Sequence, residues 1–404
     1  MSPTPPSQPD DSSSLDEVLH VGHGKDAQEP VLPAVSLPQP ARLEIRELFQ
    51  AAVERHASDL HLLANMPPIL RIDGHLIKTE WPVLSREETK RLVYSLLTDR
   101  QKAQFERELE LDMSIGVQGL GRFRVNVHMQ RGSVEAAFRL VPPRIHSLEE
   151  LGLPPVVGEL ARKPNGLVLV TGPTGMGKTT TLAAMVDLIN HERAALIVII
   201  EDPIEYVHQN TLSVIKQREV YSDTKSFATA LIRALRQDPN VIVVGEMRDL
   251  ETIATALTAA ETGHLVLATL HTPDAPQTID RILDVFPPYQ QQQVKIQLAD
   301  CLQGVISQQL LPRKEGPGRV LACEVMVATS AVRHLIREHA TNQLPTVIQT
   351  GAQYGMCTMD SSLKELSLKQ LISYETAISH AKHPEEFHML ASPRPRKRPF
   401  FHKP

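Results

Sequence analysis

Several features that would point to particular protein classes are scarce or missing in this sequence. The three cysteines lie far apart and lack CxxC spacing, so they offer neither a disulfide framework nor a zinc site. This usage favours a reducing, cytoplasmic setting. No stretch approaches the roughly 18 apolar residues that span a bilayer, and the first residues lack the basic and apolar regions of a secretion signal. We therefore expect neither an exported nor an integral membrane protein.

An excess of positive charge is also missing. The net charge is −5 and the pI is about 6.4, whereas nucleic-acid binders usually carry a basic face or a basic excess. We therefore expect no nucleic acid partner. With 404 residues, of which 42% are hydrophobic, the chain is long enough for about two to three domains with at least one sizeable core.

The two ends of the chain differ from the rest in composition. Residues 1–41 are rich in Pro, Ser, Asp and Gln and have little periodic hydrophobicity, which predicts a disordered leader. Residues 384–404 end in "SPRPRKRPFFHKP" and are predicted to form a basic, disordered tail. Contact of this tail with anionic lipid or with an acidic partner is the alternative.

Residues 42–141 show the mixed patterns of a small α/β domain. An amphipathic helix is followed by short strands that turn at Asp73 and Gly74 as a hairpin. The stretches "GRFRVNVHMQ" and "VEAAFRLV" alternate like antiparallel strands. Two capping boxes predict the starts of further helices. They are Ser85 with Glu88 and Thr98 with Gln101.

A linker at 142–165 leads to a second domain at 166–383. Its short strands "GLVLVT", "ALIVII", "VIVVG" and "HLVLATL" are apolar throughout and alternate with helices. Continuous apolar strands are typical of a parallel sheet that is covered on both faces. From about Pro287 onward we expect a helix-rich segment that packs beside this sheet.

The stretch "GPTGMGKT" fits the P-loop pattern G-x-x-x-x-G-K-[ST] and lies between a predicted strand and a predicted helix. In such a loop, glycines let backbone N–H groups surround phosphate oxygens at a helix N-terminus. Lys178 supplies a cation to the phosphates, and the Thr179 hydroxyl is placed to ligate Mg²⁺. The predicted phosphate-binding residues are Gly172, Pro173, Thr174, Gly175, Met176, Gly177, Lys178, Thr179 and Thr180.

Two further strands end in groups that could serve a P-loop enzyme, and a third is bracketed by such groups; the enzyme needs an acid for water and cations for developing charge. One of them raises a question, because Gly245 stands where a magnesium-holding aspartate is expected. Each cluster taken alone could be only the solvated end of a strand, and three together favour a site. The clusters are Glu201, Asp202 and Glu205; Glu246, Arg248 and Asp249; and His264 with His271.

Several runs, in order, resemble the secretion ATPases that power type IV pili and type II secretion, and among them the pilus-retraction motors. They include "SDLHL", "GPTGMGKTTTLAAM", "EDPIEYVHQN", "QREV" and "GEMRDLETIATALTAAETGHLVLATLHT" within residues 43–382. The resemblance implies an α/β fold with a PAS-like N-terminal domain, a RecA-like ATPase domain and a helical C-terminal part. It also implies ATP as the nucleotide and a homohexameric ring.

The family pattern also implies roles for single residues. Glu246 would be the general base, Glu201 would assist at the magnesium and water site, and His264 and His271 would link nucleotide state to neighbouring elements. Gly245 is the residue that retraction motors carry, whereas Met176 replaces a usual serine. Five arginines are candidates for reaching nucleotide or a neighbouring subunit. They are Arg122, Arg124, Arg139, Arg233 and Arg236.

A cytoplasmic motor at the inner membrane that hydrolyses ATP to retract a pilus is the function that the resemblance implies. Its partners would be an inner-membrane platform protein and a sister retraction ATPase. Extension motors usually carry a four-cysteine zinc insertion, which Cys301, Cys323 and Cys357 cannot build. Three alternatives stay open: an accessory retraction ATPase, a nucleotide-binding regulator with little hydrolysis, and a nucleic-acid translocase, against which the acidic balance argues.

Overall fold

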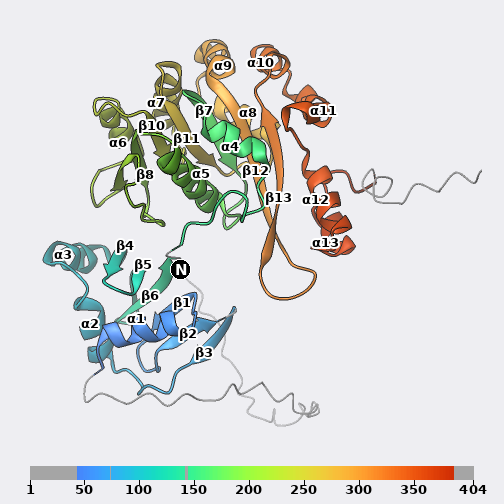
Figure 1. Ribbon diagram of the computed structural model, residues 1–404. Helices are drawn as coiled ribbons and strands as arrows, with labels where there is room; N and C mark the ends of the chain where they lie inside the picture. Colours follow the sequence, from blue (N-terminus) through green and yellow to red (C-terminus); the bar gives the residue numbers. More distant parts are fainter. Residues whose placement is uncertain (1–42, 73, 142–143, 386–404) are drawn as a thin grey trace, which may run out of the picture. The chain divides into compact units, whose positions relative to one another are not determined.

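The computed structural model describes residues 43–72, 74–141 and 144–385. The predicted leader, nearly all of the predicted tail and Asp73 of the predicted hairpin turn lie outside these residues. None of the helices within the described ranges is long and apolar enough to cross a membrane. The described chain contains two sheets (Figure 1), one in an N-terminal part (43–141) and one in a C-terminal part (144–385).

The N-terminal part is built on a six-stranded antiparallel sheet in the order β3-β2-β1-β6-β5-β4. The two predicted alternating strands are confirmed as β5 and β6, and β2 pairs with β3 in antiparallel register on either side of the predicted hairpin turn. The strands are β1 (Asp59–Leu62), β2 (Ile69–Ile72), β3 (His75–Lys78), β4 (Glu110–Val117), β5 (Gly121–Gln130) and β6 (Ser133–Val141).

Three helices complete this part. The predicted capping boxes are both present, since Ser85 and Thr98 accept hydrogen bonds from the backbone N–H groups three residues later. The core is aromatic: the Phe49 ring stacks on Phe123 with centroids 4.3 Å apart and meets Phe138 edge-on at 5.1 Å. The helices are α1 (Ile45–Glu54), α2 (Arg86–Tyr94) and α3 (Asp99–Glu108).

The C-terminal part contains a seven-stranded sheet in the order β13-β12-β7-β11-β10-β8-β9. Every neighbouring pair is parallel except β12 with β13. The predicted parallel arrangement is therefore confirmed. The strands are β7 (Gly166–Thr171), β8 (Leu196–Glu201), β9 (Val214–Glu219), β10 (Val241–Val244), β11 (Leu265–Leu270), β12 (Leu302–Pro312) and β13 (Arg319–Val327).

Helices cover both faces of this sheet, which explains why its strands are apolar throughout. Leu167 and Leu169 pack in the core that includes α6 to α9, whereas Val168 and Val170 pack against α4 and α5. Successive side chains of a strand point to opposite faces, so both sets must be hydrophobic. The helices are α4 (Pro155–Ala161), α5 (Lys178–Glu192), α6 (Phe227–Ala234), α7 (Leu250–Glu261), α8 (Ala275–Asp284) and α9 (Pro288–Cys301).

The segment after Pro287 contains the predicted helices, but it also adds two long strands, β12 and β13, that were not predicted. The first of these strands was missed because the polar residues of "LQGVISQQLLP" interrupt its apolar pattern. Ser307 and Gln308 are fully buried, and their side chains hydrogen-bond with Thr171 and Thr181 at 2.8 and 2.7 Å. Helical elements follow: α10 (Ser330–Arg337), η1 (Thr341–Gln343), α11 (Leu344–Thr350), η2 (Ala352–Tyr354), α12 (Met359–Leu368) and α13 (Tyr374–His380).

Candidate active site

The P-loop lies at the carboxyl end of β7, where ligands bind in open parallel sheets. Its three glycines have positive φ angles of 135°, 81° and 82° at Gly172, Gly175 and Gly177, a region that glycine enters without steric cost. A Cβ atom at Gly172 would lie 2.5 Å from the carbonyl oxygen of Gln308. Glycine is thus required both by the turn and by the close approach of β12.

Lys178 opens α5 and lies in the middle of this edge. Its Nζ donates to the carbonyl oxygens of Gly172 at 2.7 Å and Pro173 at 3.0 Å, and it lies 3.4 Å from His271 Nδ1. Burial lowers the pKa of Lys178, against the opposing effect of Glu246 and Glu205. The ammonium group is therefore held close to the loop mainly by neutral carbonyl oxygens. Its charge is thus available to an anion such as a phosphate group.

The rest of the loop is fixed by side chains from other elements. The Thr180 hydroxyl lies 3.0 Å from that of Tyr206. Met176, which stands in place of a usual serine, accepts a hydrogen bond at its Sδ from the backbone N–H of Leu310 at 3.2 Å. Arg319 donates from Nη1 to the Gly175 carbonyl oxygen at 3.3 Å. The β12 and β13 hairpin thus supports the P-loop from outside.

Glu246 follows β10 at the same edge and is held from two sides. Its Oε1 lies 2.7 Å from Nε of Arg248 and 2.9 Å from Nε2 of His271, and its side chain is 18% exposed. Burial acts to raise the pKa of Glu246, but the Arg248 hydrogen bond and the charge of His271 lower it overall. The carboxylate is therefore kept ionised and oriented.

Glu201 ends β8 and has the opposite environment. Its side chain is buried, and burial together with Glu205 raises the pKa of Glu201 to about 8. Gln217 donates to its Oε2 at 3.4 Å. A small cavity of about 20 Å³ is lined by Glu201, Thr179, His208 and Gly245. The acid therefore lies beside the predicted magnesium ligand, in surroundings that favour its protonated form.

Gly245 explains how Glu201 fits there. A Cβ atom at this position would lie 3.1 Å from the Ile200 carbonyl oxygen and 3.3 and 3.5 Å from Cα and Cγ of Glu201. An aspartate at 245 would therefore press on the neighbouring strand and on its glutamate. Position 245 lacks the expected aspartate, but the adjacent strand provides an acid nearby, Glu201.

The structure does not bring every predicted residue to this edge. His264 precedes β11, whereas His271 follows it, so the two histidines lie at opposite ends of one strand. His264 Nδ1 hydrogen-bonds to the Ala259 carbonyl oxygen at 3.0 Å. Arg233 and Arg236 lie at the exposed end of α6 that leads into the start of β10, also away from this P-loop. Of these two histidines and two arginines, only His271 lies with Lys178 and Glu246 at the P-loop edge.

The three arginines of the N-terminal part lie on its strands and have separate surroundings. Arg139 donates from Nε to Asp59 Oδ1 at 2.9 Å within that part. Arg122 donates to Glu219 Oε2 at 2.8 Å and to the Ile204 carbonyl oxygen at 3.1 Å. Arg124 acts to lower the pKa of Asp202, although burial of that acid raises it overall. None of the contacts described for these arginines is with the P-loop itself.

Two residues at the site were missed by sequence reasoning. Gln217 joins Glu201 to the segment after β8, because its Nε2 also donates to the Tyr206 carbonyl oxygen at 2.6 Å and its Oε1 accepts from His208 N at 3.0 Å. Arg319 reaches the P-loop from 144 residues further along the chain. The run "QREV" already contained Gln217, but no local pattern identifies Arg319.

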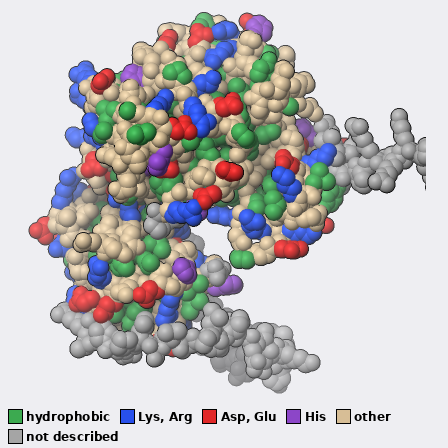
Figure 2. Space-filling model, in the orientation of Figure 1, with side chains coloured by type: hydrophobic (Ala, Val, Ile, Leu, Met, Phe, Trp, Pro, Cys, Tyr) green, Lys and Arg blue, Asp and Glu red, His purple; other side chains and the backbone are tan. Residues whose placement is uncertain are grey.

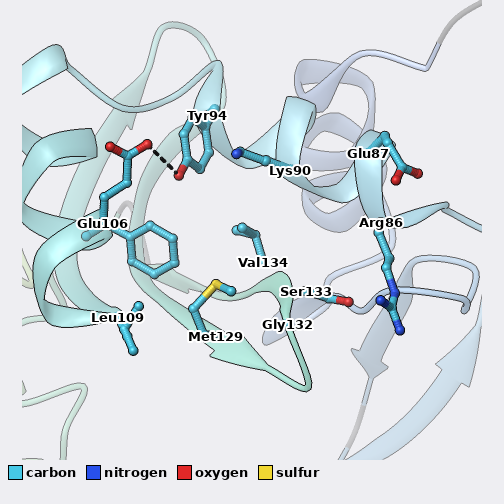
Figure 3. Close-up of a pocket in the computed structure, with 11 residues that line it drawn as sticks. Arg86, Glu87, Lys90, Tyr94, Glu106, Leu109, Met129, Gly132, Ser133 and Val134 are labelled. Atoms are coloured by element: carbon cyan, nitrogen blue, oxygen red, sulfur yellow. Dashed lines mark hydrogen bonds between the residues drawn. The ribbon is translucent and has the colours of Figure 1, made fainter.

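A separate cavity of about 460 Å³ lies in the N-terminal part between α2, α3 and the β5–β6 turn (Figure 3). Lys90 Nζ lies 4.9 Å from the centre of the Tyr94 ring, and the Tyr94 hydroxyl donates to Glu106 at 3.3 Å. Val134 and Met129 form apolar lining. This cavity contains no P-loop residue and is distinct from the site at the strand ends.

Comparison with known proteins places this arrangement in context. Residues 38–368 match the family described as type II/IV secretion system protein. The chain is 49% identical over 345 residues to the "Type IV pilus retractation ATPase PilT" of Pseudomonas aeruginosa, covering 85% of this chain and 100% of that protein. It is 38% identical over 348 residues to the "Type IV pilus ATPase PilU" of the same organism, covering 86% and 91%.

The fold agrees with a solved structure. A crystal structure of the pilus retraction motor PilT with bound ADP superposes with a TM-score of 0.82 at 49% identity, covering 86% of this chain and 100% of that one. The similarity therefore includes both sheets and the P-loop edge.

Proposed function

Because the chain belongs to the type II/IV secretion system protein family, we propose that it is an ATP-hydrolysing motor that retracts type IV pili and thereby drives twitching motility. The observation that carries this function is the meeting of Lys178, Glu246 and His271 at the P-loop edge. Identity to PilT exceeds identity to PilU, 49% against 38%, which favours the retraction motor over the accessory ATPase.

The P-loop geometry suits the phosphates of ATP. The backbone N–H groups between Gly172 and Thr179 and the positive end of α5 favour an anion, and Lys178 adds a cation. The Thr179 hydroxyl is the protein ligand that we propose for Mg²⁺. The described residues contain no group of three or more His, Cys, Asp or Glu arranged to hold a metal ion, which fits an ion held largely by water and phosphate oxygens. Magnesium bound there would neutralise charge that develops on the phosphates.

Glu246 is proposed to orient and deprotonate the attacking water. A general base must be ionised, and the contacts with Arg248 and His271 keep it so. His271 also lies next to Lys178, so its position depends on both the base and the phosphate cation. Glu201, buried beside Thr179, is proposed to assist from the neighbouring strand.

The remaining proposals concern assembly. We propose that residues 42–141 and 166–383 form two domains of a subunit that works in a homohexamer at the cytoplasmic face of the inner membrane. An inner-membrane platform protein and a sister retraction ATPase are the proposed partners. Arg233, Arg236 and His264 lie away from this chain's P-loop and are candidates for contacts with a neighbouring subunit. Figure 2 shows acidic and basic side chains interspersed on the visible face.

The function is tested by replacing the gene with a Lys178→Ala copy. We expect loss of twitching with abundant surface pili, and purified Lys178→Ala protein that binds ATP weakly because the phosphate cation is gone. Loss of motility together with loss of pili would assign extension instead. Negligible hydrolysis by assembled hexamers of the unchanged protein would favour the nucleotide-binding regulator.

A further inference from the structure

An ion triad of two buried acids and one solvent-accessible lysine lies in the C-terminal part, outside the P-loop. Lys382 Nζ is 2.9 Å from Glu324 Oε2 and 3.3 Å from Asp274 Oδ2. Glu324 lies on β13 and is 3% exposed, and Asp274 is the N-cap of α8 and is 9% exposed. Lys382 follows α13 and is separated from Asp274 by more than a hundred residues of sequence. The fold therefore brings one cation to two acids that are nearly inaccessible to water.

Both carboxylates hold the start of α8. Glu324 Oε1 accepts a hydrogen bond from the backbone N–H of Ala275 at 2.9 Å. Asp274 accepts from the backbone N–H and the side chain of Gln277 at 2.9 and 3.0 Å. Among the described residues, Lys382 is the only lysine or arginine in an ion pair with either acid. Removing one partner of a buried pair leaves an uncompensated charge, which is strongly unfavourable.

The start of α8 is tied to the P-loop edge by a short connection. His271 contacts Glu246 at 2.9 Å and Lys178 at 3.4 Å, and only Thr272 and Pro273 separate it from Asp274. The Thr272 hydroxyl also lies 2.6 Å from that of Thr278 in α8. The loop from His271 to Asp274 is thus fixed at one end by the site and at the other by the triad.

The last helices, α12 and α13, position Lys382 in the triad. Its backbone N–H and that of His383 donate to the two carboxylate oxygens of Asp360 at 2.8 and 3.1 Å. Asp360 lies in α12, which packs on β13 together with α13 in the same core. Figure 1 shows α12 and α13 next to each other beside β13. The triad therefore joins the C-terminal helices to the loop that carries His271.

We propose that Lys382 is a positioning residue for ATP hydrolysis. By neutralising Asp274 and Glu324 it fixes the loop after β11, so that His271 stays between Glu246 and Lys178. This inference rests on the proposed function. In this role Lys382 touches neither the nucleotide nor the attacking water, and it acts through the position of His271.

The kinetic test compares purified full-length hexamers. For Lys382→Met we expect kcat to fall about tenfold or more, because small displacements of catalytic groups reduce rates strongly. KM for ATP should change less than threefold, because the P-loop contacts are untouched. Lys382→Arg keeps the charge and should retain kcat within about threefold of the unchanged protein.

A second substitution separates positioning from general loss of structure. Glu324→Gln in the Lys382→Met background removes one buried charge but keeps an acceptor for the Ala275 N–H group, so kcat should largely recover. The matched control is Lys369→Met, which breaks an exposed pair with Glu365 in the same C-terminal helices and should leave kcat unchanged. A double variant as defective as Lys382→Met, or normal kcat in Lys382→Met, overturns the proposal.

Hydrogen exchange gives a readout that does not depend on turnover. In the full-length protein without added nucleotide, amides of residues 271–277 should exchange faster in Lys382→Met and return toward normal in the double variant. Unchanged exchange in Lys382→Met overturns the inference. Absence of hydrolysis by the unchanged protein would instead reject the proposed function, and the exchange result would still decide whether Lys382 fixes this loop.

Discussion

Two glutamates at the ends of neighbouring strands have opposite environments. Glu201 at the end of β8 is buried beside Gly245, and its pKa is raised to about 8. Glu246 at the end of β10 is held by Arg248 and His271, and its pKa is lowered. Two acids whose environments separate their pKa values can take different roles in one site. On this basis we propose that Glu246 is the base and that Glu201 holds a proton.

The largest expected effect comes from removing the base. Glu246→Gln should lower kcat by about 10²–10⁴-fold, the usual cost of losing a general base. ATP binding should persist, because Lys178 and the loop glycines are unchanged. Steady-state hydrolysis and equilibrium ATP binding measure the two quantities.

The matched control for that experiment is Glu251→Gln, an exposed glutamate in the first turn of α7. Its kcat should stay within about twofold of the unchanged protein, since surface substitutions away from special features have small effects. Near-normal turnover by Glu246→Gln would reject Glu246 as the base, and with it the proposed difference in role between Glu246 and Glu201.

The next effect concerns the glycine that leaves room for Glu201. Gly245→Ala should cost about 1–3 kcal/mol of unfolding free energy, because its Cβ would press on backbone atoms of β8 that cannot easily move. Chemical denaturation measures the change. Gly116→Ala is the control, since a Cβ there meets nothing within 4 Å; equal stability losses at the two positions would remove the steric account of Gly245.

Some parts of the fold and of the candidate site could be predicted from the sequence, and others could not. The P-loop and the strands β7, β8, β10 and β11 were predictable because continuous apolar runs and glycine spacing are local signals, whereas the edge strand β9, with the sequence VIKQRE, has no such run and was missed. β12 was not, because its buried Ser307 and Gln308 look exposed until their partners Thr171 and Thr181 are known. Acidic strand ends identified Glu201 and Glu246, but their opposite pKa shifts arise from packing between strands.

Long-range pairs set the limit of sequence reasoning at the site. Arg319 and Lys382 lie far along the chain from the groups they contact, and no spacing rule relates them. The sequence placed His264 and His271 on either side of one predicted strand, and the six residues of that strand put the two histidines at opposite edges of the sheet.

The pH dependence of the unfolding free energy tests the raised pKa of Glu201, with a smaller expected effect. A native acid with a pKa near 8 keeps its proton at pH values where the unfolded chain has lost it, so stability falls as pH rises from about 4.5 to 8. His208, whose pKa burial lowers to about 4, acts in the opposite direction below its ordinary pKa near 6.5. The clean window is therefore pH 6.5 to 8.

Within that window, Glu201→Gln should make the stability curve flatter. The difference in unfolding free energy between the unchanged protein and Glu201→Gln should change by about 1.4 kcal/mol per pH unit. Denaturation curves without nucleotide at several pH values measure it. Parallel curves for the two proteins would mean that Glu201 is ionised in the folded state.

The smallest expected effect acts on the other glutamate. Arg248→Ala removes the hydrogen bond that lowers the pKa of Glu246, so more of the base is protonated at low pH. The acidic limb of the kcat profile should therefore move to higher pH. Arg107→Ala serves as the control, because Arg107 has the same side-chain exposure of 72% and pairs with another glutamate. A profile that does not move would show that Arg248 does not tune the base.

The protonation of the two glutamates can also be observed directly. Infrared spectra of the nucleotide-free protein distinguish a protonated carboxyl group from a carboxylate by its carbonyl stretch. At pH 7 we expect a protonated-carboxyl band in the unchanged protein and in Glu246→Gln that disappears in Glu201→Gln and titrates near pH 8. A band that survives Glu201→Gln, or its absence from the unchanged protein at pH 7, would contradict the account.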